Sequence, residues 1–301
     1  MKALVNTSKG LVVKTVPDPI PTASKALVAV RAFSVNRGEL ALLAARTEDW
    51  RPGQDIAGVV VEPAADGTGP AAGARVVGLA EDSGWAELAA VPTSRLAELP
   101  DEVDIEQAAA LPLAGRTALN TIRLGGNLLG RKVLVTGATG GVGEFQVQLA
   151  VLAGARVTAV ARPEAESRLT RLGAASVVPT VADADGPYHL IAESTGGQSL
   201  RDAIARTAPG ATVVVLGTTS GEKTPVDVYD FIGHESARLV NYMSYADTSP
   251  ISTDLRLLLE LVAAKKLETN LGFRADWAQV DAAIDGLRHR KFRGKAVLTI
   301  Q

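Results

Sequence analysis

The sequence predicts an α/β protein that combines a doubly wound parallel sheet with a second, β-rich domain. The first observation is a change near residue 100, from short strands broken by Pro and Gly to strands that alternate with helices. The second is a glycine-rich turn that follows an apolar strand at residues 132–136. The third is a final apolar strand at residues 296–300, which we expect to rejoin the first domain.

The first hundred residues contain short apolar runs, each bounded by turn residues. Frequent strands separated by Pro and Gly are typical of an all-β unit, here a small barrel. The expected strands cover residues 26–35, 55–62, 75–79 and 85–91.

From residue 104 onward, the apolar spacing alternates between helical and extended periods. Such alternation predicts parallel strands joined by right-handed crossover helices. We expect strands at residues 132–136, 156–160, 177–178, 190–192, 211–216 and 239–242, and helices at 104–111, 117–124, 142–153, 164–172, 200–208, 253–265 and 277–287. The predicted domains are therefore residues 1–115 together with 246–301, and residues 116–245.

Composition and charge exclude several classes of protein. The 301 residues are 47% hydrophobic and carry a formal net charge of −2, which is ordinary for a globular chain and unlike a nucleic-acid binder. Cysteine is absent, and the three histidines, His189, His234 and His289, lack the spacing of a helical metal pair, so we expect no metal site. With no signal peptide and no apolar run of membrane-spanning length, a cytoplasmic protein without membrane contact is expected.

The most informative segment is the strand, glycine turn and helix at residues 133–143. In this context glycines let the main chain approach a pyrophosphate and let the helix pack on the strand, and the helix start offers N–H groups to phosphate. A glycine turn without a ligand is the alternative, which the lengths of the flanking strand and helix disfavour. The candidate cofactor contacts here are Ala138, Thr139, Gly140, Gly141, Val142 and Gly143.

The end of the next strand indicates which dinucleotide binds. An NAD site places an acidic residue there to take the ribose hydroxyls, whereas Ala161, Arg162 and Pro163 follow this strand. A guanidinium can pair with a 2′-phosphate through several donors, so Arg162 favours NADPH. The alternative for Arg162 is a solvated surface residue.

Six segments resemble the zinc-independent quinone oxidoreductase branch of the medium-chain dehydrogenase/reductase superfamily. They lie at residues 34–39, 52–59, 73–79, 108–118, 133–143 and 293–298. The resemblance implies a GroES-like, β-barrel-type catalytic domain and a Rossmann domain, with NADPH held in a cleft between them. It also implies hydride transfer to small quinones or α,β-unsaturated carbonyls.

The resemblance assigns roles to further residues. Asn36 would line the substrate side, and Thr117 would lie beside the nicotinamide. Two loops that contain Gly217, Thr218, Val240 and Met243 would flank the nicotinamide. In this superfamily the last Rossmann strands often pair across a two-fold axis, so a homodimer is expected through residues 239–242.

The chain also departs from its relatives. Zinc-dependent members carry a Cys near the position of Asn36 and a Gly-His-Glu where this chain has Gly53-Gln54-Asp55, so activity without zinc is expected. The tyrosine common in quinone oxidoreductases is replaced by Leu40-Ala41-Leu42, and the usual lysine in the helix after the second strand has no clear counterpart.

Hydride transfer suits a chain with neither a metal site nor a Ser-His-Asp arrangement, because the cofactor supplies the reducing equivalent. Quinones and enones accept hydride without a Lewis acid, since conjugation stabilises the developing oxyanion. Arg37 and Tyr242 are the candidates for stabilising that oxygen, with a structural role as the alternative for each. A 2-enoyl-thioester reductase, and an NADPH-binding sensor or partner-binding protein with little turnover, stay open as other functions.

Overall fold

The computed structural model describes residues 1–300, which form two compact units. The first unit contains Met1–Arg116 and the chain from Ser249 onward, and the second is Thr117–Thr248. Helix α3 (Pro112–Arg123) passes from one into the other. Each unit has its own principal sheet.

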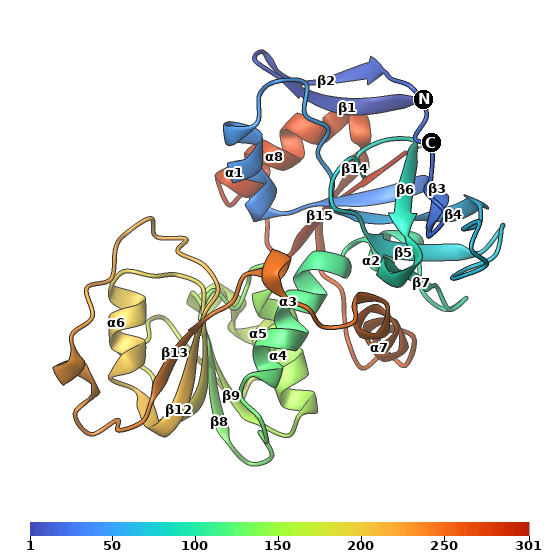
Figure 1. Cartoon of the computed structure of the whole chain (residues 1–301). Coiled ribbons are helices and arrows are strands. Elements are labelled where there is room, and N and C mark those ends of the chain that lie inside the picture. Colours follow the sequence, from blue (N-terminus) through green and yellow to red (C-terminus); the bar gives the residue numbers. More distant parts are fainter. Residues whose placement is uncertain (301) are drawn as a thin grey trace. The chain divides into compact units, whose positions relative to one another are not determined.

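The sheet of the first unit is mainly antiparallel and is centred on β3 (Figure 1). Strand β3 (Lys25–Val35) pairs antiparallel with β4 (Asp55–Glu62) and with β15 (Lys295–Thr299). The strand order is β14 (Leu271–Asp276), β15, β3, β4, β5 (Arg75–Leu79) and β7 (Leu96–Glu98), with β6 (Leu88–Pro92) also paired to β3. A separate hairpin joins β1 (Lys2–Thr7) and β2 (Gly10–Thr15). The helices are α1 (Arg37–Ala45), α2 (Ile105–Ala109), α7 (Ile251–Ala263) and α8 (Val280–Arg288), with 3-10 turns η1 (Thr93–Arg95) and η5 (Trp277–Gln279).

The core of this unit packs apolar side chains from β3, β4, β6 and β15. Trp85 is fully buried, and its ring stacks on Phe33 with 5.4 Å between centroids. The Trp85 indole Nε1 donates to the Ser34 carbonyl oxygen at 3.2 Å, so the polar end of this large side chain is satisfied. These contacts fix the end of β3 from which the candidate residue Asn36 follows.

Helix α1 corrects the expectation of an all-β unit in the first hundred residues. Asn36 has extended backbone and begins the helix, and the Glu39 carboxylate accepts from the Asn36 N–H at 2.8 Å. This is half of a capping box, in which the carboxylate satisfies an N–H that helix geometry leaves unpaired. The short apolar run in residues 40–43 hid this signal.

The second unit is a six-stranded, wholly parallel sheet with helices on both faces (Figure 1). Helix α6 lies on one face, and α4 and α5 lie on the other. The strand order is β10 (Ser176–Val178), β9 (Arg156–Val160), β8 (Lys132–Val135), β11 (Tyr188–Glu193), β12 (Thr207–Val215) and β13 (Arg238–Asn241). The helices are α4 (Gly143–Leu152), α5 (Glu166–Arg171) and α6 (Gln198–Ile204), with η2 (Pro163–Ala165), η3 (Val228–Phe231) and η4 (Ser244–Ala246).

The doubly wound parallel sheet predicted from the sequence is confirmed. Every predicted strand and helix of this unit exists, with bounds that shift by a few residues. Helix α3 begins at Pro112 rather than at residue 117, and β12 begins at Thr207, where a helix was expected to continue. Within residues 1–300, no helix is both long and apolar enough to cross a membrane.

Candidate active site

The glycine turn lies at the carboxyl end of β8, near the middle of the parallel sheet. The chain runs from β8 to β9 on one side and later returns to β11 on the other, so the turn lies where the winding of the sheet reverses. Ligands of open α/β sheets bind at such a switch point, beyond the carboxyl ends of the strands. The fold therefore puts this turn where a dinucleotide binds.

Close backbone packing explains two of the glycines. Gly137 has φ of +58°, a conformation that side chains rarely adopt, and its carbonyl accepts from the Gly140 N–H at 2.9 Å. A Cβ on Gly143 would lie 2.3 Å from the Gly137 carbonyl oxygen, which no real side chain tolerates. The turn thus meets α4 at a distance that only glycine allows, and the strand, turn and helix start fit a pyrophosphate.

The cofactor contacts predicted at residues 138–142 all lie on this one turn. Ala138 is buried, and its N–H points to the Val160 carbonyl oxygen, 3.4 Å away at the end of β9. The intervening residues are exposed or half-buried, which leaves them accessible to a ligand; they are Thr139, Gly140, Gly141 and Val142.

Arg162 follows β9 and is exposed. Because β9 pairs with β8 in parallel, and Ala138 approaches Val160, the Arg162 segment lies beside the glycine turn. Within residues 1–300, the Arg162 guanidinium makes no hydrogen bond or ion pair. The structure thus leaves its donors available, which is the arrangement expected of a residue that binds a phosphate.

A third turn follows β12. Gly217 lies against the Ser194 carbonyl oxygen, which a Cβ would approach to 3.1 Å, and Thr218 is exposed. Val240 lies on the edge strand β13, and Met243, just after it, is half-exposed. These residues and the glycine turn belong to the same unit and follow neighbouring strands.

Thr117 and Tyr242 both have defined surroundings in the second unit. Thr117 is buried on α3, where its carbonyl accepts from the Thr121 hydroxyl at 2.7 Å. The Tyr242 hydroxyl donates to the Asp247 carboxylate at 2.6 Å, and the Asn120 amide donates to the same oxygen at 2.7 Å. The Tyr242 proton is therefore directed to Asp247.

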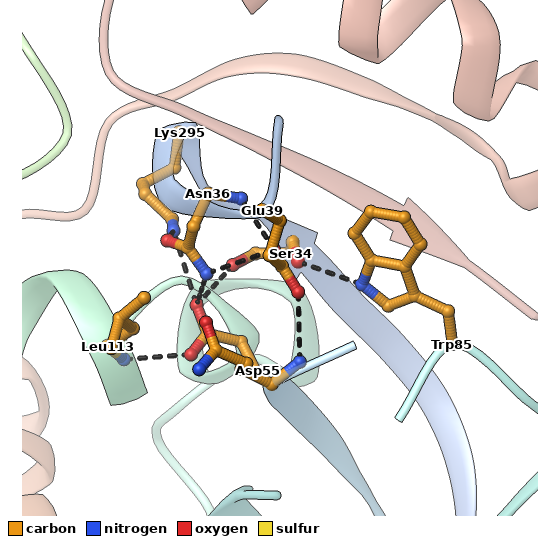
Figure 2. Close-up of polar contacts among 8 residues, drawn as sticks. Ser34, Asn36, Glu39, Asp55, Trp85, Leu113 and Lys295 are labelled. Atoms are coloured by element: carbon orange, nitrogen blue, oxygen red, sulfur yellow. Dashed lines mark hydrogen bonds and ion pairs between the residues drawn. The ribbon is translucent and has the colours of Figure 1, made fainter. Parts of the chain in front are cut away.

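In the first unit, Asn36 is part of a buried polar cluster with Asp55 and Lys295 (Figure 2). The Asn36 amide nitrogen donates to Asp55 Oδ2 at 2.8 Å, and the Lys295 ammonium donates to Asn36 Oδ1. The same ammonium lies 3.2 Å from Asp55 Oδ2, which also accepts from the Ser34 hydroxyl at 2.5 Å. Asp55 Oδ1 accepts from the Leu113 N–H at 2.8 Å.

These contacts engage both ends of the Asn36 amide and hold its orientation. Asp55 and Lys295 are almost fully buried, so each charge depends on the other and on its hydrogen bonds. Asn36 itself is 7% exposed, so only an edge of it can meet a substrate.

Glu39 is the second carboxylate of this cluster and is fully buried. Its two oxygens accept from the backbone N–H groups of Asn36 and Gln54, at 2.8 and 3.0 Å. Burial, and then the neighbouring Asp55 carboxylate, raise the pKa of Glu39 to about 8, although its hydrogen bonds and Lys295 oppose the shift.

Arg37 begins α1 at the surface. One of its N–H groups donates to the Leu287 carbonyl oxygen at 3.1 Å, at the end of α8. Burial, followed by the charge of Arg290, lowers the pKa of Arg37 from its usual value. Asn36 and Arg37 thus belong to the first unit, and Tyr242 belongs to the second.

The cluster does not fit zinc. Where zinc would need thiolate or imidazole ligands, this chain has an amide, a carboxylate and an ammonium. Lys295 already supplies positive charge to the Asn36 and Asp55 oxygens, and a second cation there would be repelled. Among residues 1–300, no three His, Cys, Asp or Glu side chains gather in a way that could hold a metal.

Comparisons with known proteins agree on one family. A family profile described as zinc-binding dehydrogenase matches residues 141–264. The putative quinone oxidoreductase YhfP of Bacillus subtilis is 34% identical over 197 residues, 60% of this chain and 60% of that protein. The chloroplast envelope quinone oxidoreductase homolog of Arabidopsis thaliana is 34% identical over 211 residues, 65% of this chain and 63% of that protein. The matched regions thus span less than two thirds of these relatives' own length.

A different kind of relative is the spectinabilin polyketide synthase system protein NorB of Streptomyces orinoci. It is 36% identical over 222 residues, which are 71% of this chain and 9% of that much larger protein.

Solved structures match over the whole chain. An alcohol dehydrogenase superfamily protein from Novosphingobium aromaticivorans gives a TM-score of 0.90 at 25% identity, covering 100% of both chains. The Escherichia coli quinone oxidoreductase, solved in complex with NADPH, gives a TM-score of 0.88 at 17% identity, also covering 100% of both chains.

The two units and these matches support a quinone oxidoreductase-like member of the medium-chain dehydrogenase/reductase superfamily. The fold class predicted from the sequence is confirmed.

Sequence reasoning missed Lys295 as a member of the buried cluster around Asn36, and it did not single out Glu193. Lys295 is 259 positions from Asn36 and reaches it because Ala296 pairs with Val35 across β15 and β3. Glu193 ends β11 directly after three apolar residues, at positions 190–192, and is fully buried. A charged residue that closes an apolar run was the available signal for Glu193.

Proposed function

We propose that the protein is an NADPH-dependent reductase that transfers hydride to small quinones or α,β-unsaturated carbonyls without zinc. The observation that carries this proposal is the accessible glycine turn at the switch point of the sheet, with the unpaired Arg162 guanidinium beside it. The quinone oxidoreductase relatives support the acceptor class.

In this proposal the second unit binds the cofactor and the first is the catalytic domain. The N–H groups at the turn and at the start of α4 bind the pyrophosphate, and Arg162 pairs with the 2′-phosphate. Thr117, Gly217, Thr218, Val240 and Met243 flank the nicotinamide. NADPH, when bound, supplies the hydride.

The substrate side depends on Asn36 and Arg37. The Asp55 and Lys295 contacts hold the Asn36 amide in one orientation, so it meets the acceptor without reorganisation. Of the two candidates for stabilising the acceptor oxygen, Arg37 is favoured, because it has guanidinium N–H groups beyond the one that Leu287 uses. The Tyr242 hydroxyl already donates its hydrogen bond to Asp247. The final proton then comes from solvent or from a weak acid.

The test is NADPH oxidation with benzoquinone, naphthoquinone, a short enone and, in the reverse direction, a simple secondary alcohol with NADP⁺. We expect turnover of the conjugated acceptors and none of the alcohol. Turnover of the alcohol alone would overturn the proposal. NADPH binding without reduction of any acceptor would instead favour a sensor or partner-binding protein.

A second candidate is a 2-enoyl-thioester reductase, and the match to a polyketide synthase protein favours it. Such an enzyme reduces the same conjugated carbon–carbon bond but recognises a thioester. Comparing a short enoyl thioester with its oxygen ester separates the two, since a thioester reductase should prefer the first by its kcat/KM.

We also propose a homodimer formed through β13. This strand is the edge of the parallel sheet, and large apolar side chains on it and in the segments before and after it are exposed. They are Val226, Val228, Tyr229, Ile232, Leu239, Met243 and Tyr245. An uncovered edge with such neighbours favours pairing with a second copy. A monomeric mass at micromolar concentration would contradict the dimer.

A cytoplasmic location of the protein stays a prediction.

A further inference from the structure

Glu193, the last residue of β11, is a fully buried carboxylate that the proposed chemistry does not use. Four donors surround it: the Thr136 and Ser199 hydroxyls at 3.1 and 2.8 Å, and the Thr195 and Gly196 N–H groups at 3.1 and 2.9 Å. Within residues 1–300, no ammonium or guanidinium pairs with it. Neutral donors alone therefore stabilise its charge, which makes the carboxylate depend on their placement.

These donors connect two neighbouring strands at their carboxyl ends. Thr136 directly precedes the Gly137 of the glycine turn, and its hydroxyl both donates to Glu193 and accepts from the Ser194 N–H at 2.8 Å. The Ser194 hydroxyl returns a hydrogen bond to the Thr136 carbonyl at 3.2 Å. The beginning of the glycine turn is thus bound to the segment after β11.

The same segment holds the turn that follows β12. The Thr219 N–H donates to the Ser194 carbonyl at 3.1 Å, and the Ser220 N–H donates to the Thr195 carbonyl at 2.8 Å. A chain of contacts therefore runs from the glycine turn through residues 194–196 to the turn that contains Gly217 and Thr218. Glu193 accepts hydrogen bonds from Thr195 and Gly196, which form the middle of this series of contacts.

We propose that Glu193 is a positioning residue that sets the spacing between the glycine turn and the turn after β12, and thereby pre-organises the NADPH site. This inference rests on the proposed function. A carboxylate is required because its two oxygens accept from donors on both sides. A glutamine would present an NH₂ group to at least one of those donors, and the segment would have to move.

The test compares E193Q with wild type and with D183N, which alters an exposed carboxylate that precedes β11. We expect E193Q to weaken NADPH binding by about 10- to 100-fold, to raise the KM for NADPH similarly, and to leave kcat at saturating NADPH within about 2-fold. D183N should match wild type. Circular dichroism at the assay temperature checks that each variant is folded.

Thr136 supplies a second pair of variants. T136V removes the hydroxyl that joins Glu193 to Ser194 and should weaken NADPH binding in the same direction, whereas T136S keeps the hydroxyl and should restore it. If wild type binds no NADPH, the proposed function fails and this inference fails with it. If wild type binds NADPH and folded E193Q and T136V bind it equally well, only the positioning role is refuted. If E193Q does not fold, equal NADPH binding by T136V and T136S refutes the positioning role.

Discussion

Glu39 should make the stability of the first unit depend on pH across the neutral range. Its pKa is about 8 in the folded chain, against 4.5 for an ordinary glutamate. Between these values the folded state holds a proton that the unfolded chain has released. The unfolded chain then binds fewer protons, so the free energy of unfolding falls as pH rises from about 4.5 to about 8.

The shift sets the size of the effect. Each pKa unit corresponds to about 1.4 kcal/mol, so the difference between 4.5 and about 8 is on the order of 5 kcal/mol between the two limits. A loss of about 2 kcal/mol over this range would already lower Tm by about 4–8 °C in a unit of this size.

The perturbation is E39Q, which imitates the protonated carboxyl at every pH. We expect a shallower fall of Tm between pH 5 and 8 in E39Q than in wild type, measured by differential scanning calorimetry. E48Q, at an exposed glutamate after α1, is the matched control and should keep the wild-type slope. Parallel Tm curves for wild type and E39Q would refute the reasoning.

Four further outcomes test other contacts. K295M should destabilise the first unit by about 3–5 kcal/mol in urea unfolding, because it leaves Asp55 buried without its cation; unchanged stability would show that the Asp55–Lys295 ion pair does not stabilise this unit. R162E should weaken NADPH binding about 10- to 100-fold and spare NADH, and equal loss for both would remove the 2′-phosphate assignment. G140V should abolish nucleotide binding while the first unit unfolds as in wild type. Undiminished NADPH binding would contradict the assignment of the pyrophosphate to this turn. Chelators should leave turnover unchanged, whereas stoichiometric zinc in the purified protein would contradict zinc independence.

Local patterns were enough to predict the second unit. The glycine turn has a strand before it and a helix after it, and the strand and helix periods alternate regularly, so contacts between neighbours in sequence decide the structure. The end of a helix and the start of a strand are less certain, as β12 illustrates. There Thr207 and Ala208 continue a helical apolar spacing, but Thr207 pairs with Tyr188 in the sheet.

The first unit shows why some of its elements were not predicted from the sequence. Helix α1 is short and weakly amphipathic, and the N-cap Asn36 with Glu39 three residues later was its one local signal. Strands β1, β2 and β7 lack a clear alternation between buried and exposed positions, so the period of their sequence gives no strand signal.

The buried polar cluster was beyond sequence reasoning for the same reason. Asn36 was predicted as a site residue from a resemblance, but what surrounds it depends on the register of β15 against β3. That register brings a lysine near the end of the chain to an asparagine near its start. Only one alignment of the two strands does so, because a shift of one residue turns every side chain to the opposite face.

The place of β15 beside β3 affects how the chain folds during its synthesis. The second unit is continuous and complete at Thr248, so it can fold while the ribosome is still adding residues. Strand β3 is made early, whereas its partner β15 is made much later, since 259 positions separate Asn36 from Lys295. The part of β3 at residues 32–35 therefore stays unpaired on one side until β15 is made, because β6 pairs only with residues 25–29, and Asp55 lacks its cation for equally long. A nascent chain in that state exposes an unpaired strand edge to other chains, so dependence on chaperones should concentrate in the first unit.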